Sequence, residues 1–320
     1  MDNHINILIG LDINYAAYYG IMLTSLFLNN NGVQFDIYLL TDSTWTERET
    51  RKYRRLIEKY NSRLHVIEVD SQEMKGFPEI THVNLPSYYR LKASSLLPES
   101  VHKVLYLDGD IIVNGSLTPL WSTDISDYAL AGVLDTIYYD NNMYERLGYD
   151  YSYGYINAGV ALYNLNYWRE NNVSSMAIQF IKQNRNRIKW MDQDVVNALL
   201  YKEILLLPIC YNFQNRFLLN SQWKCFDAVF REDIIRAMEH PIIIHYCGSD
   251  KPWSYHYYRY PYSELFHYYR KKSLWSNSII RSPFTKYMKF LWRRMWGHPS
   301  LDENVRQKFI PEAIELYMVK

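Results

Sequence analysis

Two carboxylates interrupt an apolar stretch of the chain and are the first candidates for chemistry. Asp108 and Asp110 follow the apolar run 104–107 and precede a second apolar run, 111–113. A short apolar run that stops at polar residues and glycine is typical of a buried strand. Burying a carboxylate is costly unless the group is paired, hydrogen-bonded or bound to a metal. The Asp-Gly-Asp sequence therefore predicts either the turn of a β-hairpin or a metal site.

A histidine far along the chain could complete such a metal site. His245 follows the β-branched run 242–244. An isolated histidine after a strand is most often structural. Beside two carboxylates, it would complete a set of two oxygens and one nitrogen that suits Mn²⁺, with Mg²⁺ as the alternative. Gly248 allows close backbone approach and Lys251 carries a point charge, so this segment could also hold a diphosphate.

The elements around these residues must bring distant parts of the chain together. Apolar runs predict strands at 5–11, 35–40, 64–69, 104–107, 128–134, 155–165, 204–207 and 242–244. Helical patterns lie at 15–28, 48–60, 87–97, 167–184 and 195–201, with Asn14 and the pair Thr44 and Glu47 as predicted caps of the first two. Strands that alternate with helices indicate βαβ units, a parallel sheet and hence an α/β fold.

Polar side chains follow five of the predicted strands, where an open parallel sheet binds its ligands. They are Asp12, Asp70, Asp108 with Asp110, Asp135 and His245. No Gly-x-Gly-x-x-Gly follows the first strand, which disfavours a dinucleotide cofactor. Asp192-Gln193-Asp194 precedes the helix at 195–201 and, taken alone, is an ordinary acidic helix start. The loops 136–154 and 211–226 are rich in tyrosine or amide side chains and are the predicted acceptor loops.

The composition narrows the class of protein. The chain has 320 residues, 48% of them hydrophobic, and its net charge of +1 gives no field that would attract nucleic acid. Three cysteines without framework spacing indicate a reducing compartment. We find no signal-peptide pattern and no apolar run of membrane-spanning length. A cytoplasmic protein is expected.

The C-terminal part differs in character, so we divide the chain into a domain at 1–273 and a helical appendage at 274–320. Residues 281–296 hold five basic and five aromatic residues and no acids. At helical spacing, apolar and basic side chains fall on different faces, which is typical of a helix at the surface of an anionic membrane. A basic helix packed on the domain explains the pattern equally well. The tail therefore predicts a peripheral contact with the inner face of the membrane or a packed terminal helix.

An ordered series of motifs covers roughly residues 5–255. It consists of Asp12-Ile-Asn14-Tyr-Ala-Ala, Tyr89-Arg90-Leu, Leu105-Tyr-Leu-Asp-Gly-Asp-Ile-Ile-Val, Ser116-Leu-Thr-Pro-Leu-Trp, Tyr155-Ile-Asn157-Ala158-Gly-Val, Asp192-Gln193-Asp194 and His245-Tyr-Cys-Gly248-Ser-Asp-Lys251-Pro-Trp. The series resembles the family 8 retaining glycosyltransferases, which include bacterial lipopolysaccharide galactosyl- and glucosyltransferases and glycogenin. With this resemblance, a metal site becomes the favoured interpretation of Asp-Gly-Asp.

The resemblance implies a GT-A fold, which is a Rossmann-like, mixed but mainly parallel sheet flanked by helices, here with a C-terminal helical appendage. It implies UDP-glucose or UDP-galactose as donor and Mn²⁺ or Mg²⁺ held by Asp108, Asp110 and His245. Implied donor contacts are Ile9, Gly10, Asp12 and Asn14 for the uridine, Arg90, Asp135, Asn157, Ala158, Asp192 and Gln193 for the sugar, and Gly248 and Lys251 for the diphosphate. Gly109 stands where the family often has a bulkier residue, and we expect this position to point away from the metal.

The implied activity is transfer of a hexose to a saccharide or glycolipid acceptor in cell-surface polysaccharide or lipopolysaccharide synthesis. Gln193 is a poor nucleophile, so we favour front-face attack over double displacement, with Gln193 and Asp192 as the catalytic pair that positions the sugar. Three alternatives stay open. They are a self-glucosylating, glycogenin-like enzyme, a non-catalytic UDP-sugar-binding module and a nucleotidyltransferase, the last disfavoured because no phosphate loop lies near Gly10.

Overall fold

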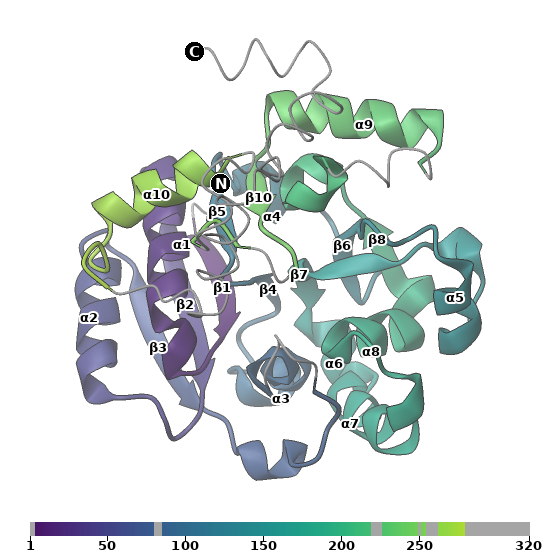
Figure 1. Cartoon of the computed structure of the whole chain (residues 1–320). Coiled ribbons are helices and arrows are strands. Elements are labelled where there is room, and N and C mark those ends of the chain that lie inside the picture. Colours follow the sequence, from purple (N-terminus) through teal and green to yellow (C-terminus); the bar gives the residue numbers. More distant parts are fainter. Residues whose placement is uncertain (1–3, 80–84, 219–225, 249–250, 254–261, 279–320) are drawn as a thin grey trace, which may run out of the picture.

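A mixed sheet of seven strands lies at the centre of the computed structural model (Figure 1), which describes residues 4–79, 85–218, 226–248, 251–253 and 262–278. Its strand order is β3-β2-β1-β4-β7-β6-β8. The strands are β1 (His4–Gly10), β2 (Gln34–Thr41), β3 (Arg63–Glu68), β4 (Lys103–Leu107), β6 (Leu130–Leu134), β7 (Ile156–Asn164) and β8 (Ile204–Leu206). β7 runs antiparallel to β4 and β6, and the other neighbouring pairs are parallel. The predicted α/β fold with a mainly parallel sheet is confirmed.

The Asp-Gly-Asp sequence links two different sheets. After β4, the chain enters β5 (Ile111–Val113), which pairs antiparallel with β10 (Ile243–His245) in a small sheet completed by β9 (Phe213–Gln214). The hairpin interpretation is therefore wrong, because β4 and β5 do not pair. The backbone N–H of Asp108 donates to the Gly159 carbonyl at 2.8 Å, and the N–H of Tyr246 donates to the Asp110 carbonyl at 3.0 Å. The motif thus bridges β7 and the end of β10.

The alternation of side chains along the central strands gives each face of the sheet its own core. Ile7 of β1 packs in the core that includes residues of α1 and α2, whereas Leu8 belongs to the opposite core, with residues of α6, α7 and α8. The helices are α1 (Ala16–Asn29), α2 (Glu47–Glu58), α3 (Ala93–Leu96), α4 (Thr118–Trp121), α5 (Asn141–Leu147), α6 (Leu165–Glu170), α7 (Val173–Gln183), α8 (Met191–Leu200), α9 (Ala228–Glu239) and α10 (Ser263–Lys272). Both faces are therefore covered, as a parallel sheet requires.

Two predicted helix caps are wrong. The Thr46 side chain, and not the predicted Thr44–Glu47 pair, caps α2 by accepting from the Glu49 N–H at 3.4 Å. Asp12 caps the turn after β1, where its carboxylate accepts from the Asn14 N–H at 2.9 Å. A cap must stand in extended backbone two or three residues before the N–H groups that it binds. Several oxygen-bearing residues lie close together at both places, so the local sequence alone did not identify the cap.

Three predicted segments differ in their secondary structure. The loop 136–154 contains α5, and the single helix at 167–184 is divided into α6 and α7 where Asn172 adopts a left-handed φ of 52°. The helix at 87–97 is a 3₁₀ helix, Leu85–Lys92, followed by the short α3. Such divisions arise from packing against the sheet rather than from hydrophobic spacing.

The predicted basic helix at 281–296 lies outside the described residues. Trp275, just beyond the predicted boundary at 273, is buried and packs edge-on against Tyr53 of α2. The division of the chain and the membrane contact stay predictions. Within the part of the chain that the structure describes, none of the helices combines the length and apolar character needed to cross a membrane.

Candidate active site

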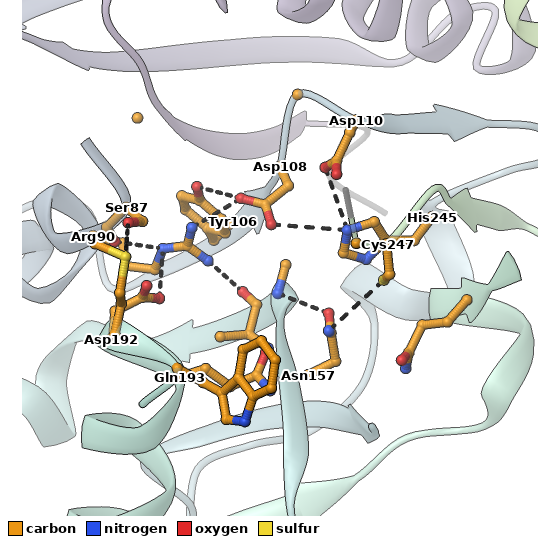
Figure 2. Close-up of a pocket in the computed structure, with 18 of the residues that line it drawn as sticks. Ser87, Arg90, Tyr106, Asp108, Asp110, Asn157, Asp192, Gln193, His245 and Cys247 are labelled. Atoms are coloured by element: carbon orange, nitrogen blue, oxygen red, sulfur yellow. Dashed lines mark hydrogen bonds and ion pairs between the residues drawn. The ribbon is translucent and has the colours of Figure 1, made fainter. Parts of the chain in front are cut away.

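A cavity of about 420 Å³ lies at the carboxyl ends of β1, β4, β6 and β10 (Figure 2). It is lined by the predicted site residues Gly10, Asp12, Arg90, Asp108, Gly109, Asp110, Asp135, Asn157, Ala158, Asp192, Gln193, His245, Gly248 and Lys251. Ile9 and Asn14 do not line it, since Ile9 is buried in the core and the Asn14 residue is exposed. Asp70 is also elsewhere, capping a 3₁₀ turn after β3. The topology thus brings most of the predicted residues to one place, although their individual roles stay predictions.

Asp108, Asp110 and His245 form a cluster with the geometry of a cation site. The His245 Nε2 atom lies 3.3 Å from Asp110 Oδ1 and 3.9 Å from Asp108 Oδ2. The three ligand atoms all lie within 4.8 Å of one another. Gly159 keeps this space open, because a Cβ there would stand 2.3 Å from His245 Cε1 and 2.5 Å from Asp108 Oδ2. Two carboxylate oxygens and one imidazole nitrogen fit Mn²⁺ or Mg²⁺.

Each carboxylate of the cluster has one oxygen turned toward His245 and the other held by a donor. Asp108 Oδ1 accepts from an Arg90 Nη atom at 2.8 Å and from the Tyr106 hydroxyl at 2.7 Å. Asp110 Oδ2 accepts from the Lys251 ammonium. Burial opposes ionisation of Asp110, but the charges of Lys251 and His245 outweigh it and lower the pKa of this carboxyl. Asp110 is therefore ionised at neutral pH, as a metal ligand must be.

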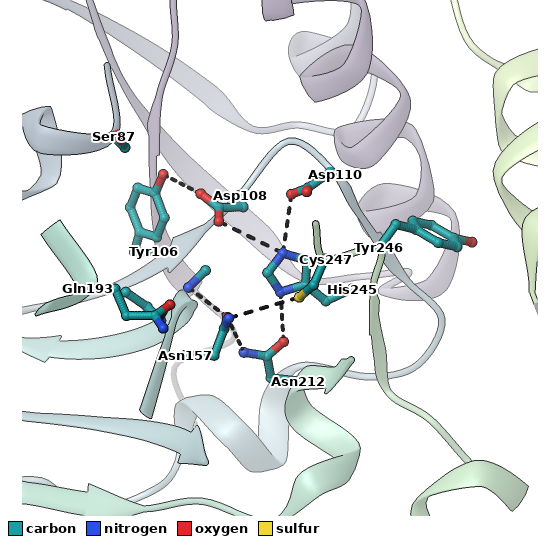
Figure 3. Close-up of polar contacts among 12 residues, drawn as sticks. Ser87, Tyr106, Asp108, Asp110, Asn157, Gln193, Asn212, His245, Tyr246 and Cys247 are labelled. Atoms are coloured by element: carbon teal, nitrogen blue, oxygen red, sulfur yellow. Dashed lines mark hydrogen bonds and ion pairs between the residues drawn. The ribbon is translucent and has the colours of Figure 1, made fainter. Parts of the chain in front are cut away.

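The orientation of His245 is fixed from behind. Its Nδ1 atom lies 3.0 Å from Asn212 Oδ1, and Asn212 Nδ2 donates to Asn157 Oδ1 at 3.0 Å (Figure 3). Asn212 is completely buried. A metal-binding histidine is usually held by such a bond at its second nitrogen, which leaves the first for the metal.

Two side-chain amides bind the carboxylate of Asp135, which also lines the cavity. Asn157 Nδ2 donates to Asp135 Oδ2 at 2.8 Å, and Gln193 Nε2 donates to the same oxygen at 3.0 Å. The Gln193 Oε1 atom accepts from the Ala158 N–H at 3.1 Å. Two donors on one oxygen stabilise the charged carboxylate and reduce its nucleophilicity.

Asp192 is the carboxylate of the site that lacks a full set of partners. Its Oδ2 atom lies 3.1 Å from Arg90 Nε, but it accepts no hydrogen bond from the described residues. Burial raises the pKa of Asp192 to about 7, although the Arg90 charge acts in the other direction. Asp192 lines the cavity, but its unpartnered Oδ2 atom is buried beside Arg90 rather than open to the cavity.

Several residues of the site were missed by the sequence reasoning. Tyr106 stands two positions before Asp108 in a strand and so shares its side, a signal that was available. Asn212 lies in the amide-rich segment that was taken for an acceptor loop. Arg216 also lines the cavity and has no ion pair within the described part of the chain, whereas Arg90 and Lys251 are both bound to carboxylates. Nothing in the local sequence distinguished Arg216 from other surface cations.

Gly109 is required by packing. A Cβ at this position would stand 2.6 Å from the ring of Tyr19, whose side chain is buried. A side chain at this position does not fit beside Tyr19 as the ring stands.

The chain is similar to known glycosyltransferases over most of its length. The family model described as glycosyl transferase family 8 matches residues 6–256. The lipopolysaccharide 1,2-glucosyltransferase of Escherichia coli K12 is 28% identical over 250 residues, which cover 78% of this chain and 72% of that protein. The lipopolysaccharide 1,3-galactosyltransferase of Salmonella typhimurium is 26% identical over 288 residues, covering 88% and 82% of the two chains.

The fold leads to the same family. The galactosyltransferase LgtC, solved in complex with donor and acceptor sugar analogues, superposes with a TM-score of 0.76 and 26% identity over 84% of this chain and 96% of that chain. This likeness confirms the GT-A fold. Because the family model spans most of the sequence and the cavity gathers the family's motifs, the chain belongs to glycosyl transferase family 8 and is a glycosyltransferase.

Proposed function

We propose that the enzyme is a retaining hexosyltransferase that transfers glucose or galactose from a UDP-sugar to a saccharide or glycolipid acceptor in cell-surface polysaccharide or lipopolysaccharide synthesis. The observation that carries the proposal is the cluster of Asp108, Asp110 and His245, in which two carboxylate oxygens face one imidazole nitrogen. The names of the relatives support a hexose donor. Free thiols at Cys210 and Cys247 accord with a cytoplasmic location.

The cluster would hold Mn²⁺, with Mg²⁺ as the alternative. When bound there, the cation supplies a Lewis acid for the charge that develops on the departing diphosphate. Lys251 donates to Asp110 beside the proposed metal site. From there its ammonium group would also bind a phosphate oxygen of the donor. Arg216, which has no ion pair within the described ranges, adds a second positive charge to the cavity. These cations make the cavity suitable for a leaving group that carries two phosphates.

The side chains around the sugar position favour front-face attack. Asp135 is the carboxylate that could act as a nucleophile, but Asn157 and Gln193 both donate to its Oδ2 atom. In the proposed step, the bond from the anomeric carbon to the phosphate oxygen breaks, and the acceptor oxygen bonds to the same face. The proton of the acceptor hydroxyl passes to the departing phosphate. Gln193 and Asp192 would orient the sugar.

The test is hydrolysis of UDP-glucose and UDP-galactose with and without Mn²⁺. We expect UDP release from one donor that depends on the metal and falls by at least about 100-fold in Asp110→Asn, because the variant loses a charged ligand. Asp127→Asn, the same change at an exposed acid, is the control. Metal-independent release, or equal release by Asp110→Asn, would refute the metal role. The anomeric configuration of the released sugar, followed by NMR, tests retention.

The same incubation separates the remaining alternatives. Mass spectrometry of the protein after exposure to UDP-glucose would show added hexose if the enzyme glucosylates itself. No UDP release from either donor, with several saccharide acceptors present, would instead indicate a non-catalytic binding module.

A further inference from the structure

We propose that Asn212 is a positioning residue that fixes the tautomer of His245 and couples the metal site to the donor-sugar site. The inference rests on the proposed metal site. Asn212 ends the 3₁₀ turn Ile209–Asn212, does not line the cavity, and is 0% exposed. A buried amide of this kind must have its donors and acceptors matched by its surroundings.

The polarity of the network can be deduced from one backbone group. The Gly159 N–H donates to Asn157 Oδ1 at 3.0 Å, and a backbone N–H can only donate. This bond fixes the Asn157 amide, so Asn212 must present its own Nδ2 to Asn157 Oδ1. Asn212 Oδ1 is then left for His245 Nδ1, which must carry the proton. When a metal binds, the imidazole must be neutral, and its lone pair then lies on Nε2, toward the two carboxylates.

A second backbone group fixes the other end. The Ala158 N–H donates to Gln193 Oε1, which turns Gln193 Nε2 toward the Asp135 carboxylate. Asn157 Nδ2 donates to the same carboxylate oxygen. Two consecutive N–H groups of β7 thus orient a continuous chain of side chains. It runs from His245 through Asn212, Asn157 and Asp135 to Gln193. Figure 3 shows its first part, from His245 through Asn212 to Asn157.

This chain joins a metal ligand to a residue proposed to touch the sugar. A bound metal or sugar that moves the side chain at one end of this chain alters the hydrogen bonds that are offered at the other end. The coupling is reciprocal, so a bound sugar should tighten the metal as much as the metal tightens the sugar. Asn212 stands at the centre of this link because it bonds to both the histidine and the Asn157 amide.

Two substitutions separate the two roles of Asn212. Asn212→Asp keeps an oxygen for the His245 Nδ1 proton, but it places a second oxygen against Asn157 Oδ1. Asn157 cannot relieve this contact by rotating its amide, because its Nδ2 would then face the Gly159 N–H. Asn212→Leu has similar volume and loses both bonds. The first variant therefore breaks the coupling alone, whereas the second also releases the histidine.

The test measures Mn²⁺ binding by calorimetry, alone, with UDP, and with the 2-deoxy-2-fluoro analogue of the preferred UDP-sugar. We expect the wild type to bind Mn²⁺ at least about fivefold more tightly with the analogue than with UDP, within the usual range of coupling. Asn212→Asp should bind Mn²⁺ alone as well as the wild type and show equal affinities with UDP and the analogue. Asn212→Leu should lose about 10- to 100-fold in affinity for Mn²⁺ alone, together with the nitrogen coupling of His245 in pulsed EPR.

Each outcome bears on one proposal. If the wild type binds no Mn²⁺, the proposed metal site fails. If the wild type binds Mn²⁺ but Asn212→Leu, shown to be folded by circular dichroism, binds it equally with the same nitrogen coupling, the role in positioning His245 is refuted. If Asn212→Asp keeps the preference for the sugar analogue, the coupling is refuted. Asn212→Asp also serves where the leucine variant does not fold.

Discussion

Asp192 and Asp194 stand two residues apart in the first turn of α8, yet they lie in opposite surroundings. Asp194 is completely buried and both of its oxygens are bonded. Arg146 binds them at 2.7 and 3.1 Å, Tyr155 donates its hydroxyl at 2.9 Å, and the backbone N–H groups of residues 189 and 190 add two further bonds. Asp192 faces the cavity beside Arg90, with an oxygen that accepts no hydrogen bond from the described residues.

The difference separates a carboxylate of the fold from a carboxylate of the site. All the bonding capacity near Asp194 is used in the folded protein, so this residue can serve only the structure. Asp192 retains an acceptor and a raised pKa, which are features of groups that await a ligand. Both interpretations of the Asp192-Gln193-Asp194 motif therefore have a place: Asp194 is the structural acid of a helix start, and Asp192 stays the predicted sugar ligand.

The largest expected effect comes from Asp194→Asn. The substitution leaves the largely buried Arg146 guanidinium without its counter-charge, and breaking a buried ion pair typically costs about 3–5 kcal/mol. For a protein of this size, that corresponds to a Tm lower by on the order of 10 °C, measured by differential scanning calorimetry. Asp127→Asn, at an exposed position, is the control for the chemical change. A Tm equal to that of the control would contradict the structural role.

Asp192→Asn should act in the opposite direction on stability. Burial raises the pKa of Asp192 from 3.8 to about 7, so the folded state holds its proton more tightly than the unfolded state. This acid therefore lowers stability progressively as pH rises from about 4 to about 7, and below pH 4 it has no effect. The neutral amide removes the cost, so the variant should be more stable than the wild type by about 1–3 kcal/mol at pH 8 and equal to it near pH 4.

Urea unfolding at the two pH values measures this change, and donor hydrolysis measures the function. We expect hydrolysis by Asp192→Asn to fall by about 10- to 1,000-fold, because the proposed sugar contact needs a charged acceptor. A variant that is less stable at pH 8 than at pH 4, relative to the wild type, would show that Asp192 belongs to the fold as Asp194 does.

The contrast also shows what a sequence can reveal. Strands and helices followed from hydrophobic spacing, and the ends of the strands marked Asp108, Asp135 and His245, because a parallel sheet gathers its carboxyl ends at one edge. The family motifs then placed Asp192 and Gln193 at the same cavity. The two acids of α8 could not be told apart, since their difference depends on Arg146, which belongs to another helix.

Hydrophobic spacing does not reveal which partners a side chain meets in distant segments of the chain. Asn212 reaches His245 and Asn157 only after three segments have folded together, and its sequence signal was no more than an amide-rich stretch. The predictions of the helix caps failed for a related reason, because Asp12 and Thr46 have near neighbours that could form the same hydrogen bonds. Tyr106 is different, since its position two residues before Asp108 placed it on the same side of β4.

The smallest effects should come from a matched pair of Tyr→Phe substitutions, one in each network. Tyr155 donates to Asp194 at 2.9 Å and Tyr106 donates to Asp108 at 2.7 Å, so each substitution removes one hydroxyl from one carboxylate. Tyr155→Phe leaves a buried charge with one donor fewer and should cost about 1–3 kcal/mol of stability without altering Mn²⁺ binding. Asp108 keeps Arg90 and a cavity-facing oxygen, so Tyr106→Phe should cost less stability.

The main consequence of Tyr106→Phe should instead be a several-fold weaker affinity for Mn²⁺, because Tyr106 orients the carboxylate that is proposed to bind the cation. Urea unfolding and Mn²⁺ calorimetry on both variants give the comparison directly. If both variants lose equal stability and neither changes the affinity for Mn²⁺, the distinction between the fully bonded carboxylate of Asp194 and the cavity-lining carboxylate of Asp108 does not hold. A loss of stability confined to Tyr155→Phe and a loss of metal affinity confined to Tyr106→Phe would establish it, since the chemical change is the same in both.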